Sequence, residues 1–242
     1  SSQNNISCNG ANDGNATVSP LGGTGSFTFI WDSGQTTANA TGLNAGQHCV
    51  TVSDANLCPE VHCITITEPT SISVTTTQND VSCNGVNDGD ATVTPSGGTG
   101  GFTFIWSSGQ TTANAVGLSG GQHCVTVSDA NLCPEVHCIT LTEPSSATLT
   151  FIQNDVSCHG GNDGDATASV TGGAGSNTFI WSASASSQSG SFATALIAGV
   201  HCVTATDGNG CDVSDCVTIT EPSSATLTFI QNDVSCHGGN DG

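Results

Sequence analysis

The chain has no lysine, arginine, tyrosine or methionine among its 242 residues. Only 8% of its residues are charged, and all 20 of them are Asp or Glu, which gives a formal net charge of −20. Binding to nucleic acid and docking to anionic lipid both depend on Lys and Arg. The composition therefore excludes nucleic acid as a partner and predicts no direct membrane contact. Trypsin-like proteases, which cut after Lys or Arg, have no site in this chain.

Aromatic residues are also scarce, at 5%, and the sequence has no apolar run of 18 or more residues. No segment is therefore long and apolar enough to cross a bilayer as a helix. The 31 glycines, together with many Ser, Thr and Asn residues, favour several small cores over one large core. Since the negative charges repel one another, we expect salt or divalent cations to offset them.

A repeat of 75 residues dominates the sequence. Cys8, Cys83 and Cys158 are 75 residues apart, and the three tryptophans have the same spacing. The last 22 residues, 221–242, are identical to residues 143–164, so a fourth repeat begins there. We expect further copies of the module in the same chain. The expected domains are module 1 at 1–69, module 2 at 70–144, module 3 at 145–222 and the start of a fourth module at 223–242.

Each repeat has the pattern of short β-strands. Polar and apolar residues alternate in segments such as 147–151, and turn residues fill segments such as 84–89. Turn signals recur every 8–12 residues, and helical periodicity is missing. The sequence therefore predicts an all-β chain of tandem Ig-like antiparallel β-sandwiches, each with about seven strands.

Thirteen cysteines in a Gly-rich β protein indicate an oxidising, extracellular environment. In the segment 49–52, Val50 and Val52 point into the core, so Cys49 points outward. The same alternation turns Cys63 outward on the next strand, opposite Cys49. We predict three cross-strand disulfides: Cys49–Cys63, Cys124–Cys138 and Cys202–Cys216. The cysteines that remain would form Cys8–Cys58, Cys83–Cys133 and Cys158–Cys211, and Cys236 opens the fourth repeat.

Zinc is the alternative use of these cysteines, because two His and two Cys residues can form a zinc site. His48 and Cys49 are neighbours on one strand, and His62 and Cys63 on the next. Adjacent strand residues point to opposite faces, however, so one ion cannot easily reach all four. The disulfide interpretation is therefore preferred.

Acidic residues recur at the module ends and turns, where two interpretations stay open. Calcium binds six to eight oxygens, many of them from carboxylates and loop carbonyls. The other interpretation is that these side chains are solvated turn residues, and it is favoured because no complete calcium-loop pattern is present. The candidate calcium ligands are Glu68, Asp80, Asp88, Asp90, Glu143, Asp155, Asp163 and Asp165. Calcium is the candidate cofactor, and no other is expected.

Enzymatic activity is not expected, since no nucleophile elbow, phosphate-binding loop or metal-binding helix motif is present. Phe27, Phe29 and Trp31 occupy alternate positions, so one face of that strand carries three aromatic rings. A buried core position is favoured for this face over a platform for sugar rings.

Several segments in order resemble the SprB-type repeat of large secreted surface proteins of Bacteroidetes, including gliding-motility adhesins. They include Ser-Cys-Asn-Gly-Val-Asn-Asp-Gly at 82–89, Gly-Gly-Thr-Gly at 97–100, Phe-Thr-Phe-Ile-Trp-Ser-Ser-Gly-Gln-Thr-Thr at 102–112, the cysteine-bearing segment 121–133 and Thr-Glu-Pro at 142–144. The resemblance covers all three repeats and the C-terminal stub. It implies an exported cell-surface fibre or adhesin built from Ig-like modules, and it supplies no catalytic residues.

The chain departs from this family at several positions. The family usually has Tyr where Phe27, Phe29 and His48 stand, and Cys49 and Cys63 are additions to its two usual cysteines. Additional disulfides suggest a tougher filament. We therefore expect a structural segment of an extracellular fibre or adhesin stalk. The alternatives are modules that bind a ligand or glycan, or a rod stiffened by calcium, and the expected partners include neighbouring fibres or surface glycans.

Overall fold

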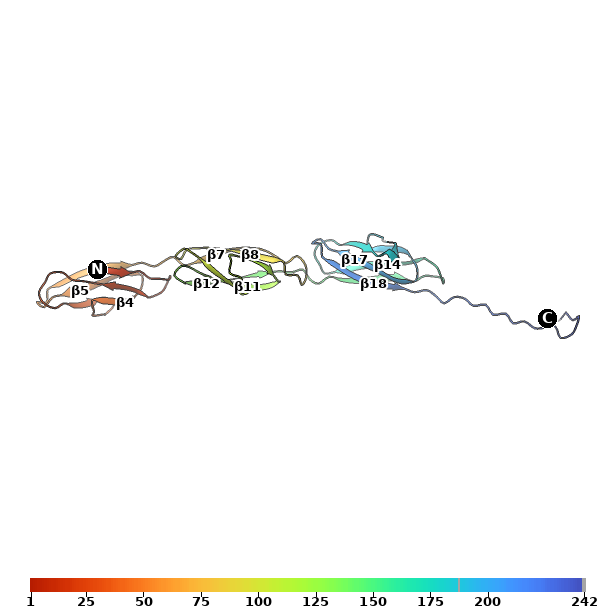
Figure 1. Cartoon of the computed structure of the whole chain (residues 1–242), viewed down its shortest axis with the longest axis horizontal. Helices are drawn as coiled ribbons and strands as arrows, with labels where there is room; N and C mark the ends of the chain where they lie inside the picture. The colour runs from red at the N-terminus through yellow and green to blue at the C-terminus, as the bar shows by residue number, and fades with distance from the viewer. Residues whose placement is uncertain (187, 241–242) are drawn as a thin grey trace. The chain divides into compact units, whose positions relative to one another are not determined.

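The computed structural model describes residues 1–186 and 188–240, and its regular secondary structure is almost entirely β-strand (Figure 1). Repeat 1 contains β1 (Ser2–Asn4), β2 (Gly14–Thr17), β3 (Thr28–Trp31), β4 (Asn39–Leu43), β5 (Gly46–Ser53) and β6 (Pro59–Ile66). Repeat 2 contains β7 (Ser73–Asn79), β8 (Gly89–Ser96), β9 (Thr103–Trp106), β10 (Asn114–Leu118), β11 (Gly121–Ser128) and β12 (Pro134–Leu141). Repeat 3 contains β13 (Thr148–Asn154), β14 (Gly164–Thr171), β15 (Thr178–Trp181), the short 3₁₀ helix η1 (Ala183–Ala185), β16 (Phe192–Leu196), β17 (Gly199–Thr206) and β18 (Asp212–Ile219). Among the described residues, no helix has the length and apolar character needed to span a membrane.

Every repeat folds into two three-stranded antiparallel sheets. In repeat 1 the strand orders are β1-β2-β4 and β3-β5-β6, and repeats 2 and 3 follow the same scheme. The described part of each repeat thus has six strands, where the sequence predicted about seven. The prediction of Ig-like antiparallel β-sandwiches is otherwise confirmed.

The two sheets of a repeat enclose a small core with a tryptophan inside it. Trp31, Trp106 and Trp181 are at most 2% exposed, and each lies in a separate cluster of buried apolar side chains. The indole Nε1 of Trp31 donates a hydrogen bond to the carbonyl of Thr37 at 2.9 Å, which satisfies its one polar atom. The aromatic face predicted for the core is therefore in the core, and Phe27 and Phe29 pack at its edge.

The alternation expected for half-buried strands accounts for these cores. In β5 the side chains of Val50 and Val52 are buried, whereas Thr51 between them is partly exposed. In β6, Ile64 and Ile66 are buried and Thr65 is exposed. The outward positions of these two strands are thus free to carry the cysteines.

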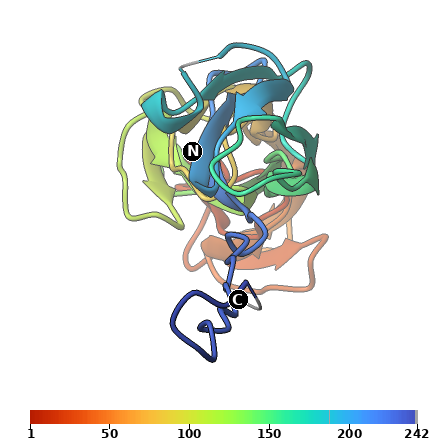
Figure 2. The same ribbon diagram turned by 90° about the vertical axis from the view of Figure 1, so that its right-hand side faces the viewer.

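The chain divides into two compact units, one of residues 1–81 and 85–143, the other of residues 82–84 and 144–242. The three-residue segment 82–84 groups with repeat 3, where Cys83 is bonded to Cys211. After β18 the chain continues to residue 240 without a strand, and Figures 1 and 2 draw this segment as a plain tube that ends at the C-terminus. Its apolar side chains are exposed.

Candidate functional site: disulfides within and between repeats

Three disulfides join the last two strands of each repeat. Cys49 and Cys63 lie directly opposite each other in the antiparallel register of β5 and β6, and their Cα atoms are 4.0 Å apart. The register brings the equivalent residues of repeats 2 and 3 together in the same way. The predicted bonds are confirmed: Cys49–Cys63, Cys124–Cys138 and Cys202–Cys216.

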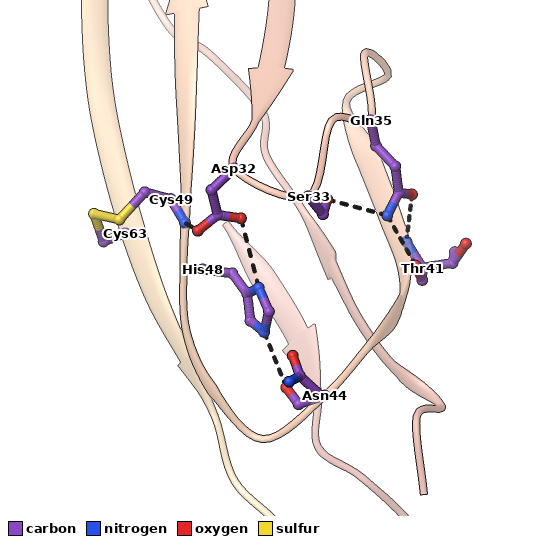
Figure 3. A network of polar contacts seen from close by, with 8 residues as sticks. All are labelled: Asp32, Ser33, Gln35, Thr41, Asn44, His48, Cys49 and Cys63. Atoms are coloured by element: carbon purple, nitrogen blue, oxygen red, sulfur yellow. Dashed lines mark hydrogen bonds and ion pairs between the residues drawn. A yellow bond between two sulfur atoms is a disulfide. The ribbon is translucent and has the colours of Figure 1, made fainter.

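Figure 3 shows the polar contacts beside the first of these bonds, where His48 and Cys49 point in different directions. Asp32 Oδ2 accepts a hydrogen bond from the backbone N–H of Cys49 at 2.8 Å, and its Oδ1 lies 3.6 Å from His48 Nδ1. The other ring nitrogen of His48 is 2.9 Å from the carbonyl of Asn44. With Cys49 held in a disulfide and His48 turned toward Asn44, these side chains do not form the alternative zinc set.

A glutamine side chain supports the loop that follows the tryptophan strand (Figure 3). Gln35 accepts a hydrogen bond from the N–H of Thr41 and donates one to its carbonyl, at 2.9 and 3.0 Å. Its amide therefore pairs with the backbone of β4 as a neighbouring strand would. Gln110 and Gln188 make the same two contacts in repeats 2 and 3.

The other predicted pairing, within each repeat, is wrong. Two further disulfides join consecutive repeats: Cys8–Cys133, with Cα atoms 5.6 Å apart, and Cys83–Cys211, with Cα atoms 5.8 Å apart. The first cysteine of a repeat thus bonds to the third cysteine of the next repeat. The predicted pairs Cys8–Cys58, Cys83–Cys133 and Cys158–Cys211 do not form. Among the described residues, Cys58, Cys158 and Cys236 are exposed free thiols.

The direction of the first strand explains why the first and third cysteines of one repeat cannot meet. Gln3 donates a side-chain hydrogen bond to the carbonyl of Thr65, and the N–H of Ile6 donates to the carbonyl of Thr67. The start of the repeat therefore runs alongside β6 in the same direction, and Cys8 lies beyond the C-terminal end of β6. Cys58 lies just before that eight-residue strand begins. The length of the strand, roughly 26 Å at 3.3 Å per residue, therefore separates Cys58 from Cys8. A disulfide needs Cα atoms within about 7 Å.

A short loop, which we call the clasp loop, carries the third cysteine and consists of residues 129–133 in repeat 2 and 207–211 in repeat 3. The carboxylate of Asp129 accepts hydrogen bonds from the backbone N–H groups of Asn131, Cys133 and Thr99, at 2.9, 3.0 and 2.8 Å. Asn131 Nδ2 in turn donates to the carbonyl of Ser7, beside Cys8, at 2.8 Å. The carboxylate of Asp129 thus fixes the conformation of the loop. The loop in turn places the side-chain amide of Asn131 and the sulfur of Cys133 against the preceding repeat.

Repeat 3 reproduces this arrangement although its sequence has diverged. Asp207 accepts hydrogen bonds from the N–H groups of Asn209, Cys211 and Ala174, and Asn209 Nδ2 donates to the carbonyl of Ser82 at 2.8 Å. The shared pattern is Asp-x-Asn-x-Cys, which also occurs at 54–58. Reasoning from the sequence assigned no role to these aspartates, but the recurrence of this pattern in all three repeats is the signal that could have found them.

Hydrogen bonds to backbone N–H groups lower the pKa of each clasp-loop aspartate. For Asp129 the largest contribution comes from the N–H of Thr99, and for Asp207 from that of Cys211. Asp54 in repeat 1 has a lowered pKa for the same reason, with the N–H of Cys58 as its largest contribution. A carboxylate that accepts several N–H groups is stabilised in its charged form.

Replacing Asp129 with Asn should therefore lower the melting temperature of the oxidised chain by several degrees at pH 7. A carboxyl whose pKa is lower in the folded state stabilises the fold above its unfolded-state pKa, and this stabilisation is lost as the pH falls through the folded-state pKa. The difference in melting temperature between D129N and the parent chain should consequently shrink below about pH 4. Thermal unfolding followed by circular dichroism between pH 7 and pH 2 measures both effects. Glu135→Gln, at an exposed position of β12, is the matched control; an equal loss in E135Q would contradict this role for Asp129.

The candidate calcium ligands mostly accept hydrogen bonds from nearby protein groups. Glu68 accepts from the N–H of Gly10 at 2.7 Å, and Asp80 accepts from the N–H of Thr142 at 2.9 Å. Within residues 1–186 and 188–240, no three His, Cys, Asp or Glu side chains are grouped so as to hold a metal ion. Five other candidates behave similarly: Glu143 with Gly85, Asp90 with Asn79, Asp155 with Thr220, Asp163 with Ser157 and Asp165 with Asn154.

Comparison with protein families agrees with this repeat organisation. The family model described as the SprB repeat matches residues 1–36, 75–111 and 150–186. A search of curated proteins found no match. Among solved structures, the eight N-terminal Ig domains of Down Syndrome Cell Adhesion Molecule match with 8% identity and a TM-score of 0.40, over 81% of this chain and 33% of that one.

Domains 1–6 of the surface layer protein SbsC match with 13% identity and a TM-score of 0.26, over 84% of this chain and 36% of that one. The chain thus spans about a third of the length of either protein. The repeat family and the disulfides point to a cell-surface or extracellular protein. This chain is a tandem array of three Ig-like β-sandwiches, and the SprB repeat model matches the first half of each.

Proposed function

We propose that this chain is a structural segment of a long extracellular fibre or adhesin stalk on a bacterial surface. The observation that carries the proposal is the pair of disulfides between consecutive repeats, Cys8–Cys133 and Cys83–Cys211. Covalent bonds between repeats add no catalytic group and no ligand-binding group. A fibre that bears tension, or that is exposed to proteases, benefits from them directly.

The two long disulfide loops overlap in sequence. One spans residues 8–133 and the other spans residues 83–211. Every peptide bond from residue 8 to residue 211 therefore lies inside at least one closed loop. A single break in the backbone of this stretch leaves the two parts covalently joined. This redundancy suits a load-bearing element outside the cell, because one cut in the backbone does not break the fibre.

The repeats 1–69, 70–144 and 145–222 are the modules of this fibre, and residues 223–242 begin another. Each of the three has its own small core and its own cross-strand disulfide. A sandwich of about 75 residues buries a marginal core, and disulfides are a common means of stabilising domains of that size. Stability in such an array depends on each module and its immediate neighbours.

Force spectroscopy on the whole chain, pulled from its two termini, tests this function. In oxidising buffer the disulfides should prevent most of residues 8–211 from extending, so unfolding should release much less length than a free chain at about 3.3–3.6 Å per residue. After reduction the released length should rise to that of the free chain. Equal extension before and after reduction would contradict a load-bearing role.

A passive segment should also bind no surface glycan and need no metal. We expect a glycan array to show no ligand for the oxidised chain, and a chelator to leave its melting temperature unchanged. Selective glycan binding would favour the alternative that the modules are themselves adhesive. A marked loss of stability on chelation would favour the calcium-stiffened rod.

A further inference from the structure

We propose that copies of this chain associate side by side through an uncharged sheet face that repeats 1 and 2 share. This surface, which we call the lateral face, is the outer side of the sheet β3-β5-β6 in repeat 1 and of the sheet β9-β11-β12 in repeat 2. Since the partner is a second copy of the same chain, this inference rests on the proposed fibre function.

A row of two apolar side chains with a threonine between them crosses each lateral face. In repeat 2, Ile105, Thr126 and Val136 lie opposite one another in the register of the three strands. Ile105 is 64% exposed and Val136 is 60% exposed. The same row in repeat 1 consists of Ile30, Thr51 and Val61. Two branched apolar side chains are thus exposed to water at the same place in both repeats.

The outward positions of these strands carry no carboxylate, although the chain has 20 acidic residues. The structure describes all six strands of the two faces, and their acidic residues are Glu60 and Glu135. Each of these glutamates lies opposite a buried valine, so each has the inward register. Asp32 lies beyond the end of β3, where it accepts a hydrogen bond from the N–H of Cys49. The outward positions hold only Thr, Ser, Gln, Pro, Cys, Ile and Val.

Repeat 3 shows that the fold does not require this surface to be apolar and uncharged. In its row, Ser214 stands where Val136 stands in repeat 2. Asp212 replaces Pro134 on the same side of the strand and accepts a hydrogen bond from the hydroxyl of Thr206. The sheet β15-β17-β18 nevertheless has the same strand order as its counterparts. The apolar row of repeats 1 and 2 is therefore available for a contact outside the chain.

The charge of the chain favours a second copy as the partner. A basic partner would be attracted to carboxylates, and the outward positions of the lateral face have none. Two copies, each with a formal charge of −20, repel one another wherever their carboxylates approach. On the lateral face they can meet without bringing carboxylates together. The contact uses the same patch on both copies and is therefore isologous.

Two lateral faces pack in the way that the two sheets of a β-sandwich pack. Such sheets lie about 10 Å apart, and side chains from both interdigitate between them. In this arrangement Ile105 and Val136 of one copy lie against the equivalent row of the other copy. Their apolar surface is then removed from water, which is the favourable contribution to the contact.

The size of the face determines how strong the contact is. In repeat 2 the three strands have four, eight and eight residues, which cover roughly 300 Å² at about 3.3 Å per residue and 4.8 Å between strands. A stable interface buries about 800 Å² on each partner. One pair of faces therefore associates weakly, and the contact becomes stable when several repeats pair along two chains. We expect reversible association for a chain with two lateral faces.

Sedimentation equilibrium tests this contact on the full chain with Cys58→Ser, Cys158→Ser and Cys236→Ser, so that no free thiol can cross-link two copies. Protein concentrations up to about 1 mM detect dissociation constants in the millimolar range. The chain should form dimers and larger species reversibly. Its association constant should rise severalfold between 0.15 M and 1 M salt, because the Debye length falls from about 8 Å to about 3 Å and the repulsion between copies is screened.

A matched pair of double variants in that background locates the contact. Thr51→Asp with Thr126→Asp puts one charge at the centre of each lateral face and should lower the association constant at least tenfold. Thr17→Asp with Thr92→Asp adds the same two charges at the centre of the other sheet of each repeat. All four threonines are partly exposed. T17D/T92D should change the association constant less than twofold, and circular dichroism should show that both variants fold.

A parent chain that stays monomeric at every salt concentration would overturn the proposal. An equal loss of association in the two double variants would also overturn it. Disulfide mapping of the same samples separates this failure from failure of the fibre function. If Cys8–Cys133 and Cys83–Cys211 form in a chain that stays monomeric, only the lateral contact fails and the fibre segment stands.

Discussion

Trypsin will cut a chain with Ser71→Arg once, and the two parts will stay together until the disulfides are reduced. The sequence has no Lys or Arg, so this arginine creates the single trypsin site. Position 71 is exposed in the connection between β6 and β7. The cut produces residues 1–71 and 72–242, and the Cys8–Cys133 bond joins them. Electrophoresis with and without reductant measures the result, and the reduced sample shows that cleavage occurred.

The alternative pairing gives the opposite outcome in this experiment. A Cys8–Cys58 bond would lie wholly within residues 1–71, and the parts would separate without reductant. Cys133→Ser added to S71R is the control, because it removes the bond between the parts without changing the trypsin site. We expect this double variant to separate completely in the absence of reductant.

Trp106→Ala should unfold repeat 2 locally, with a loss of about 3–5 kcal/mol in the free energy of unfolding. The side chain is 2% exposed in a core of few residues, and its indole N–H donates to the carbonyl of Thr112 at 2.9 Å. A cavity of that size cannot be filled by so small a core, and the carbonyl of Thr112 loses its donor. Hydrogen exchange read by mass spectrometry should show lost protection within residues 72–141.

Ile105→Ala is the matched control for this change. Ile105 precedes Trp106 in β9, but its side chain points outward and is 64% exposed. We expect I105A to change stability by no more than about 0.5 kcal/mol. An equal effect of the two substitutions would show that Trp106 does not form the centre of the core. Unchanged hydrogen-exchange protection in repeats 1 and 3, outside the residues that contact a clasp loop, would show that the effect stays within repeat 2.

Most of the fold could be predicted from the sequence because its signals are local. Alternation in segments such as 49–52 and 63–66 determines which side chains point inward, and the same alternation determines that Cys49 faces Cys63. These interactions involve neighbouring strands joined by one hairpin. A period of two along each strand is sufficient to find them.

Which cysteines connect the repeats depends on contacts between residues far apart in the sequence. Whether Cys8 can reach Cys58 depends on the direction of the first strand relative to β6, and no spacing in the sequence encodes that direction. The assumption that four cysteines pair within each repeat concealed the alternative. The recurring Asp-x-Asn-x-Cys pattern shows that the third cysteine lies in a shaped loop, but it does not reveal the partner of that cysteine.

The candidate calcium ligands show a second limit of sequence reasoning. Recurring acidic residues near turns fit both metal binding and hydrogen bonding to the backbone. Asp80 and Asp155 accept hydrogen bonds from Thr142 and Thr220, which lie more than 60 residues away in the sequence. Such partners become visible only when the first and last strands of a repeat lie side by side.

Disulfide mapping at Cys83 tests the central claim of covalent bonds between repeats most directly. A protease that cuts after Asp and Glu releases Cys83 in residues 81–88, Val-Ser-Cys-Asn-Gly-Val-Asn-Asp, and Cys211 in residues 208–212, Gly-Asn-Gly-Cys-Asp. The peptides around Cys58 and Cys133 share the sequence Ala-Asn-Leu-Cys-Pro-Glu, so Cys83 distinguishes the pairings better than Cys8 does. We expect non-reducing mass spectrometry to find peptide 81–88 linked to 208–212. Linkage of 81–88 to Ala-Asn-Leu-Cys-Pro-Glu would contradict the account.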